Sequence, residues 1–172
     1  MKAYKFLAED GRGVFSGFAW PLPDDGPGAW VASEVAACRS GIHACRPADL
    51  PYWVAPVLYE IELDGPIDRQ EIKVVAPRGR LVRRIDDWDD ETREAYSLMC
   101  VARAHELAAA APAELGGWAP PPETTAAEAA LTGYMAARIA EQLGGLDAYV
   151  EERRRQSAWL VERLNLEATG PA

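Results

Sequence analysis

The chain divides into two halves of different composition, and this asymmetry restricts the folds open to it. Eleven of its fifteen aromatic residues precede residue 100, whereas Ala, Glu, Leu and Arg dominate the remainder. Aromatic residues favour strands, and Ala, Glu, Leu and Arg favour helices. The sequence therefore predicts an α+β fold, in which an N-terminal antiparallel β-sheet is packed by three C-terminal helices.

The segment 57–63 is the clearest predicted strand, because Val57, Tyr59, Ile61 and Leu63 alternate with the residues of its opposite face. Turn residues predict two hairpins, which join residues 4–7 to 14–20 and residues 71–76 to 80–85. Shorter extended pieces are expected at residues 30–38 and 41–45.

Capping residues predict the helices. Asp89 or Asp90 begins a helix that runs to about Ala111, just before Pro112. The capping box of Thr125 and Glu128 begins a second helix, which ends at Gly144 and Gly145. A third helix extends from Asp147 to about Leu164, and its charge run at residues 151–156 is expected to face water.

Three segments follow from this pattern. Residues 1–111 form a strand-rich domain with its packing helix, and residues 112–122 form a Pro-rich connection. Residues 123–172 form a two-helix segment that packs on the same domain.

The composition excludes several classes of protein. A chain of 172 residues that is 49% hydrophobic can bury a core, and its net charge of −9 opposes binding to nucleic acid or to an anionic membrane. The start MKAYKFLAED lacks the apolar stretch of a signal peptide, and three cysteines do not make a disulfide scaffold. We expect a cytoplasmic protein.

The densest group of reactive side chains lies between Cys38 and Cys45, with His43 inside it. If residues 41–45 are extended, His43 and Cys45 point to the same face of the strand. Four interpretations are open. The cysteines can be small buried residues around a hydrogen-bonded histidine, or a pocket wall can present His43 as a general acid/base or ligand-binding group. Zinc can bind Cys38, His43 and Cys45 with Cys100 or His105, or Cys38 and Cys45 can form a disulfide.

We expect a small-molecule-binding protein or enzyme with an aromatic-lined pocket centred on His43. The sequence specifies no reaction and no cofactor, with zinc as the alternative. The catalytic candidates are His43, Cys45 and Glu62, and the substrate-binding candidates are Trp20, Trp53 and Tyr59.

A non-catalytic alternative uses the C-terminal helices. If an apolar face of these helices is exposed, they would form a protein-interaction module or a homodimer. Trp159 and Leu160 are otherwise expected to dock on the sheet.

Several motifs together resemble a family of small bacterial and phage proteins of unknown function. The resemblance covers approximately residues 4–85 and includes Tyr4-Lys-Phe-Leu, a C-x2-G-x-H-x-C motif at residues 38–45, the strand at 57–65, and Lys73-Val-Val-Ala. It implies no activity. A weaker resemblance to ADP-ribosyltransferase-like domains comes from the order of Gly41 to His43, Trp53 and the 57–63 strand, and it would make Glu60 or Glu62 catalytic.

Overall fold

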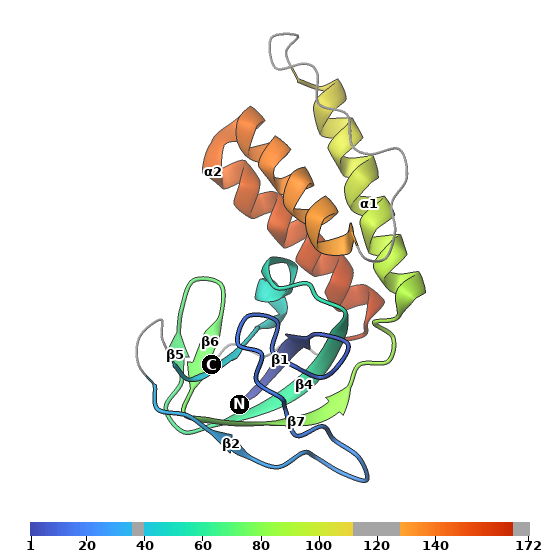
Figure 1. Ribbon diagram of the computed structural model, residues 1–172. Helices are drawn as coiled ribbons and strands as arrows, with labels where there is room; N and C mark the ends of the chain where they lie inside the picture. The colour runs from blue at the N-terminus through green and yellow to red at the C-terminus, as the bar shows by residue number, and fades with distance from the viewer. Residues whose placement is uncertain (36–39, 112–127, 167–172) are drawn as a thin grey trace.

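The computed structural model describes residues 1–35, 40–111 and 128–166. Two antiparallel sheets precede the helices, so the predicted α+β class is confirmed, and the helices cover one side of the larger sheet (Figure 1). The strands are β1 (Lys2–Leu7), β2 (Val31–Ala32), β3 (Ile42–Ala44), β4 (Val57–Asp64), β5 (Asp68–Arg69), β6 (Val74–Ala76) and β7 (Arg78–Arg84). The helices are the 3-10 helix η1 (Pro47–Tyr52), α1 (Asp90–Ala109) and α2 (Ala129–Arg163).

The larger sheet has the order β1-β4-β7-β2 and separates two hydrophobic clusters. The predicted alternation of β4 is confirmed. Its residues Val57, Tyr59, Ile61 and Leu63 belong to the cluster shared with the smaller sheet, while Leu58 belongs to the cluster shared with the helices. The alternating pattern of β4 therefore places one apolar face against each neighbouring layer.

The smaller sheet has the order β3-β6-β5, and it corrects one predicted hairpin. Segments 71–76 and 80–85 do not pair, because β6 pairs with β3 and β5, whereas β7 pairs with β4 and β2. Only Pro77 separates β6 from β7, and the chain crosses from one sheet to the other there. The sheets lie close at Gly79, where a Cβ atom would lie 2.7 Å from Ile42 Cγ2.

The predicted hairpin between residues 4–7 and 14–20 is also wrong. β1 pairs with β4 along its whole length, from Lys2 opposite Glu62 to Leu7 opposite Val57. The long apolar β4 gives β1 a better partner than residues 14–20, which form a loop with one bridge between Arg12 and Ala19. A second bridge, between Tyr4 and Cys45, joins the two sheets at β1.

The predicted helices are found, with α2 made of two arms. Asp89 caps α1 by accepting a hydrogen bond from the Thr92 backbone N–H at 2.8 Å. Gly145 has non-helical backbone angles and divides α2, so the second arm returns beside the first (Figure 1). The predicted Pro-rich connection at 112–122 and the Thr125 cap lie outside the described residues.

The charge run at residues 151–156 does not simply face water, because Glu152, Arg153 and Gln156 are buried. These three share one face of α2, and each has a partner there. Glu152 pairs with Arg103 of α1 at 3.1 Å, and Gln156 donates to the Gly133 carbonyl of the other arm at 2.9 Å. Arg153 donates to the Pro51 carbonyl of η1 at 3.1 Å, which ties the helices to the strand-rich part of the chain.

Candidate ligand-binding pocket

A pocket of about 420 Å³ opens beside β3, at the rim of both sheets. The loop 13–20 lies along one side of it, and β1, β2, β3, Trp53 and Lys73 complete the wall. This volume is within the range of pockets that hold small organic ligands. The pocket brings together four of the residues predicted for the site: Trp20, His43, Cys45 and Trp53.

Two groups of the same composition supply most of the aromatic wall. In the first group, the rings of Phe18 and Trp20 meet edge to face at 5.7 Å, and Lys5 Nζ lies 4.8 Å from the centre of the Trp20 ring. In the second group, Phe15 and Trp53 meet edge to face at 5.9 Å, and Lys73 Nζ lies 5.8 Å from the Trp53 ring centre. Each Phe–Trp–Lys group thus places a cation over an indole ring, where the ring quadrupole attracts it.

Lys5 reaches the pocket from the inner face of β1. Its side chain is on the same face as Ala3 and Leu7, and it lies opposite Tyr59 of β4 in the strand ladder. Its Nζ donates a hydrogen bond to the backbone carbonyl of His43 at 2.7 Å. Burial lowers the pKa of Lys5 from 10.5 to about 8, because the charged ammonium is poorly solvated there.

His43 lies in the middle of β3 and lines the pocket, half-buried. Burial lowers the pKa of His43 below its ordinary value of 6.5, and the positive charges of Lys73 and Lys5 lower it further. The imidazole is therefore uncharged at neutral pH and presents one N–H donor and one acceptor nitrogen.

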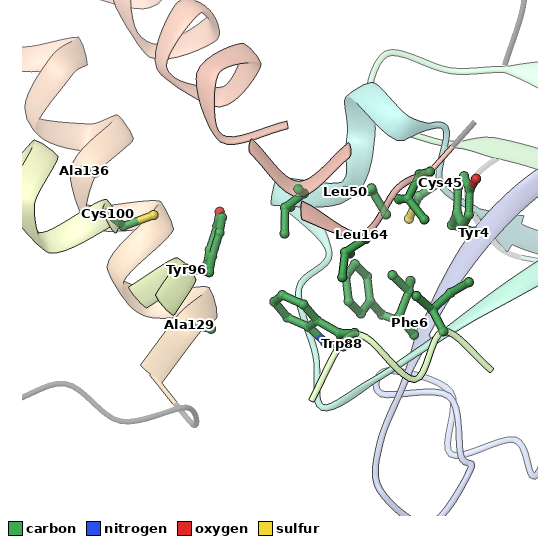
Figure 2. Close-up of a cluster of buried hydrophobic side chains, with 14 of the residues drawn as sticks. Tyr4, Phe6, Cys45, Leu50, Trp88, Tyr96, Cys100, Ala129, Ala136 and Leu164 are labelled. Atoms are coloured by element: carbon green, nitrogen blue, oxygen red, sulfur yellow. The ribbon is translucent and has the colours of Figure 1, made fainter. Parts of the chain in front are cut away.

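Cys45 has the surroundings of a structural thiol. It is 5% exposed and belongs to the cluster that also contains Tyr4 and Leu50 (Figure 2). Burial raises the pKa of the Cys45 thiol far above neutrality, so at pH 7 the sulfur is protonated and a poor nucleophile.

The zinc and disulfide interpretations involve Cys38, which lies outside the described residues. Among residues 1–35, 40–111 and 128–166, no three His, Cys, Asp or Glu side chains are grouped as metal ligands. Cys100 is buried in the cluster beneath the helices, where its thiol pKa is raised to about 12 by burial.

The structure does not bring Glu62 into the pocket. Tyr59 and Glu62 lie on opposite faces of β4. Glu62 forms an ion pair with Arg80 at 2.7 Å. Its neighbour Glu60, the other carboxylate nominated by the ADP-ribosyltransferase resemblance, pairs with Lys2 and Arg83, each at 3.1 Å. Tyr59 is buried behind Lys5 and supports the pocket from the core.

Sequence reasoning missed the two lysines. The chain has fifteen arginines and three lysines, and two of those three lysines line this one pocket. Lys5 and Lys73 are far from His43 in the sequence, and the bridge between Tyr4 and Cys45 and the pairing of β3 with β6 bring them together. The sequence feature that could have pointed to these two lysines is the scarcity of lysine in the chain.

The charge of the pocket differs from that of the whole chain. The chain carries a net charge of −9, yet the residues described as lining the pocket include Lys5, Lys73 and His43 but no aspartate or glutamate. Hydroxyls of Ser16, Ser33 and Ser40 are the other polar side chains of the wall. Within the described residues, an acidic protein has thus formed a concave surface that carries positive charge and no carboxylate.

Residues 1–92 match the family model described as a domain of unknown function (DUF7666). This match covers more than half of the chain, so the chain belongs to that family. No curated protein and no solved structure matches it. The matched segment includes the whole pocket wall, from Lys5 to Lys73. Within the described part of the chain, no helix is long and apolar enough to cross a bilayer.

Proposed function

We propose that this member of the DUF7666 family binds a small organic anion with a flat, apolar body in the pocket around His43. The observation that carries the proposal is the composition of the wall: aromatic rings supply its surface, and the side chains described on it that carry a formal charge, Lys5 and Lys73, are positive. Such a wall favours planar ligands through stacking and selects negative charge through its two lysines.

The two Phe–Trp–Lys groups divide this work. Trp53, which is partly exposed, offers the larger indole surface for a planar body, and Trp20, which is 8% exposed, offers less, while Lys73 offers an ammonium to an anionic group such as a carboxylate. An ion pair formed in a partly dehydrated pocket is stronger than one in bulk water. The uncharged His43 adds a neutral hydrogen bond, which can orient the ligand without depending on pH near neutrality.

Calorimetric titration of the full-length protein with 2-naphthoate and with 2-naphthamide tests the proposal, because the two probes share a body and differ in charge. We expect naphthoate to bind at least about tenfold more tightly than the amide, which corresponds to one ion pair of modest strength. Lys73→Met should remove this preference. Equal affinities, or no binding of either probe, would overturn the proposal.

The catalytic roles stay predictions. An uncharged imidazole beside a bound anion is suited to general acid/base catalysis. The protonated thiol of Cys45 is a poor nucleophile and is suited to a structural role in the pocket wall. Glu62 has no place in the proposed binding mode, since its carboxylate pairs with Arg80 on the other face of β4.

The alternative, an interaction module that uses the C-terminal helices, also stays a prediction. Leu98, Leu131 and Leu146 are exposed on these helices. Single exposed leucines are common on protein surfaces, so they carry less weight than the pocket does. Sedimentation velocity over a wide range of concentrations would detect a homodimer.

A further inference from the structure

We propose that Lys5 is a nucleophile that forms a reversible imine with an aldehyde or ketone group of the ligand. The inference rests on the proposed function in one respect: the carbonyl compound must enter the same pocket. It adds a covalent step to what would otherwise be simple binding.

The Lys5 nitrogen is held at the wall of the pocket. Nζ lies between two parts of the pocket wall, hydrogen-bonded to the His43 carbonyl at 2.7 Å and 4.8 Å from the Trp20 ring centre. A carbonyl oxygen accepts a hydrogen bond from an ammonium or from an amine, so this contact holds the nitrogen in place in both protonation states. The nucleophile is thereby fixed at the surface that a ligand would contact.

Among the described residues, no carboxylate pairs with Lys5. Lys2, three residues earlier on β1, forms an ion pair with Glu60 at 3.1 Å, which stabilises its charged form. Lys5 instead has an aromatic ring and a backbone carbonyl as its neighbours. β1 therefore carries one lysine that is paired with a carboxylate and one that is not. Of these two, only Lys5 lines the pocket.

Lys5 is available as an uncharged amine near neutral pH. Burial lowers the pKa of Lys5 to about 8, so roughly a tenth of the molecules carry an uncharged Lys5 at pH 7. A solvated lysine, with its pKa near 10.4, is uncharged in fewer than about one molecule in a thousand at that pH. Lowering a lysine pKa by burial is a known way to activate it for imine formation.

The proposed step balances without an oxidant or a reductant. The Nζ lone pair attacks the carbonyl carbon, and the former carbonyl oxygen takes up a proton to give a carbinolamine. Loss of that oxygen as water, together with the hydrogens that Nζ carried as a neutral amine, leaves a C=N bond. Lys73 remains available to hold an anionic group on the same ligand.

The test uses the full-length protein with 4-carboxybenzaldehyde and sodium cyanoborohydride at pH 7, which converts an imine into a stable amine. Peptide mapping by mass spectrometry then locates the adduct. We expect labelling of Lys5 at least about tenfold faster than of Lys2, Lys73 or the Met1 amine, and protection by excess 4-methylbenzoate. The labelling rate of Lys5 should rise with pH and level off above about pH 8, as its pKa requires.

Two controls separate this inference from the proposed function. Lys5→Arg keeps the positive charge and should abolish the adduct at this position, while Lys2→Arg should leave Lys5 labelling unchanged. Binding of 4-(hydroxymethyl)benzoate, which has no carbonyl, is measured by calorimetry. Suppose that 4-(hydroxymethyl)benzoate binds but the aldehyde leaves Lys5 unlabelled or labels all amines equally. The proposal that Lys5 forms an imine is then wrong, while the proposed anion-binding pocket is still supported. If neither compound binds, the proposed function fails as well. If Lys5→Arg does not fold, peptide mapping of the labelled wild-type protein still tests the proposal.

Discussion

Burial lowers the pKa values of two side chains that line the pocket, Lys5 and His43. The pKa of Lys5 is lowered to about 8, and that of His43 is lowered below its ordinary value, in each case chiefly by desolvation. The pocket therefore changes its charge near pH 8 through Lys5, and His43 stays neutral from about pH 7 upward. These properties make single substitutions informative.

His43→Ala should weaken binding of 2-naphthoate by roughly tenfold or more, because a hydrogen bond to a charged ligand is lost. Its melting temperature should stay nearly unchanged, because His43 is half-buried at the pocket and not in the core. His105→Ala, at the chain's other histidine, which is exposed on α1, is the matched control and should change neither property. A large loss of stability in His43→Ala would instead assign this histidine a structural role.

Lys5→Met tests the lowered pKa through the pH dependence of stability. Between pH 8 and 10.5 the unfolded chain binds more protons at this position than the folded chain does, so the free energy of unfolding rises with pH across that window. The variant lacks this rise. We expect wild type to gain up to about 3 kcal/mol relative to Lys5→Met from pH 7.5 to 10.5 in urea unfolding. A constant difference would show that Lys5 has an ordinary pKa in the folded state.

The loop 13–20 is the element that completes the pocket, since it supplies Phe18 and Trp20 to one Phe–Trp–Lys group and Phe15 to the other. Phe15 is 86% exposed, which is unusual for a phenylalanine, yet its ring contacts Trp53. An exposed ring of this kind adds little to folding, so binding is the better explanation for its position.

Phe15→Ala should weaken naphthoate binding about threefold to tenfold, as expected for the loss of one aromatic contact. The free energy of unfolding should change by less than about 0.5 kcal/mol, because the side chain is so exposed. Leu146→Ala, at another exposed apolar residue on α2, should alter neither quantity. Unchanged affinity in Phe15→Ala would remove the loop from the binding site.

Sequence reasoning succeeded where the signal was local. The alternation of β4, the Asp89 cap of α1 and the break at Gly145 each depend on a few neighbouring residues. It failed for both hairpins, because β1 and β6 pair with strands chosen by the two cores and not by the nearest turn. Placing Lys5 beside His43 requires a further long-range contact, the bridge between Tyr4 and Cys45, so this part of the site could not be predicted from local patterns.

At the scale of the whole molecule, the family segment and the helices share one core. Tyr4, Phe6 and Leu58 of the larger sheet lie in the same cluster as Leu160 and Leu164 of the helical region (Figure 2). The pocket lies beside this sheet's β1 and the smaller sheet, and Phe6, Cys45 and Trp53 of its wall also belong to or pack against this cluster. The helices therefore support the sheet that positions Lys5 without lining the pocket themselves.

Arg153→Ala tests this support. Arg153 is 4% exposed, donates to Pro51 and Gln156, and lies over the rings of Tyr52 and Tyr149. Its loss should lower the free energy of unfolding by about 2–4 kcal/mol, because buried polar partners are left unpaired. The next residue is the control: Arg154 has a side chain 73% exposed, and Arg154→Ala should cost less than about 0.5 kcal/mol. Similar losses in both variants would contradict the anchoring role.

The most direct test of the central claim is an NMR titration that follows the tryptophan indole N–H signals as 2-naphthoate is added. We expect the signals of Trp20 and Trp53 to shift, while those of Trp88 and Trp159, which are not among the residues that line the pocket, stay in place. The same concentration of 2-naphthamide should cause much smaller shifts. Shifts confined to Trp88 and Trp159, or equal responses to the acid and the amide, would contradict an anion-binding pocket at this position.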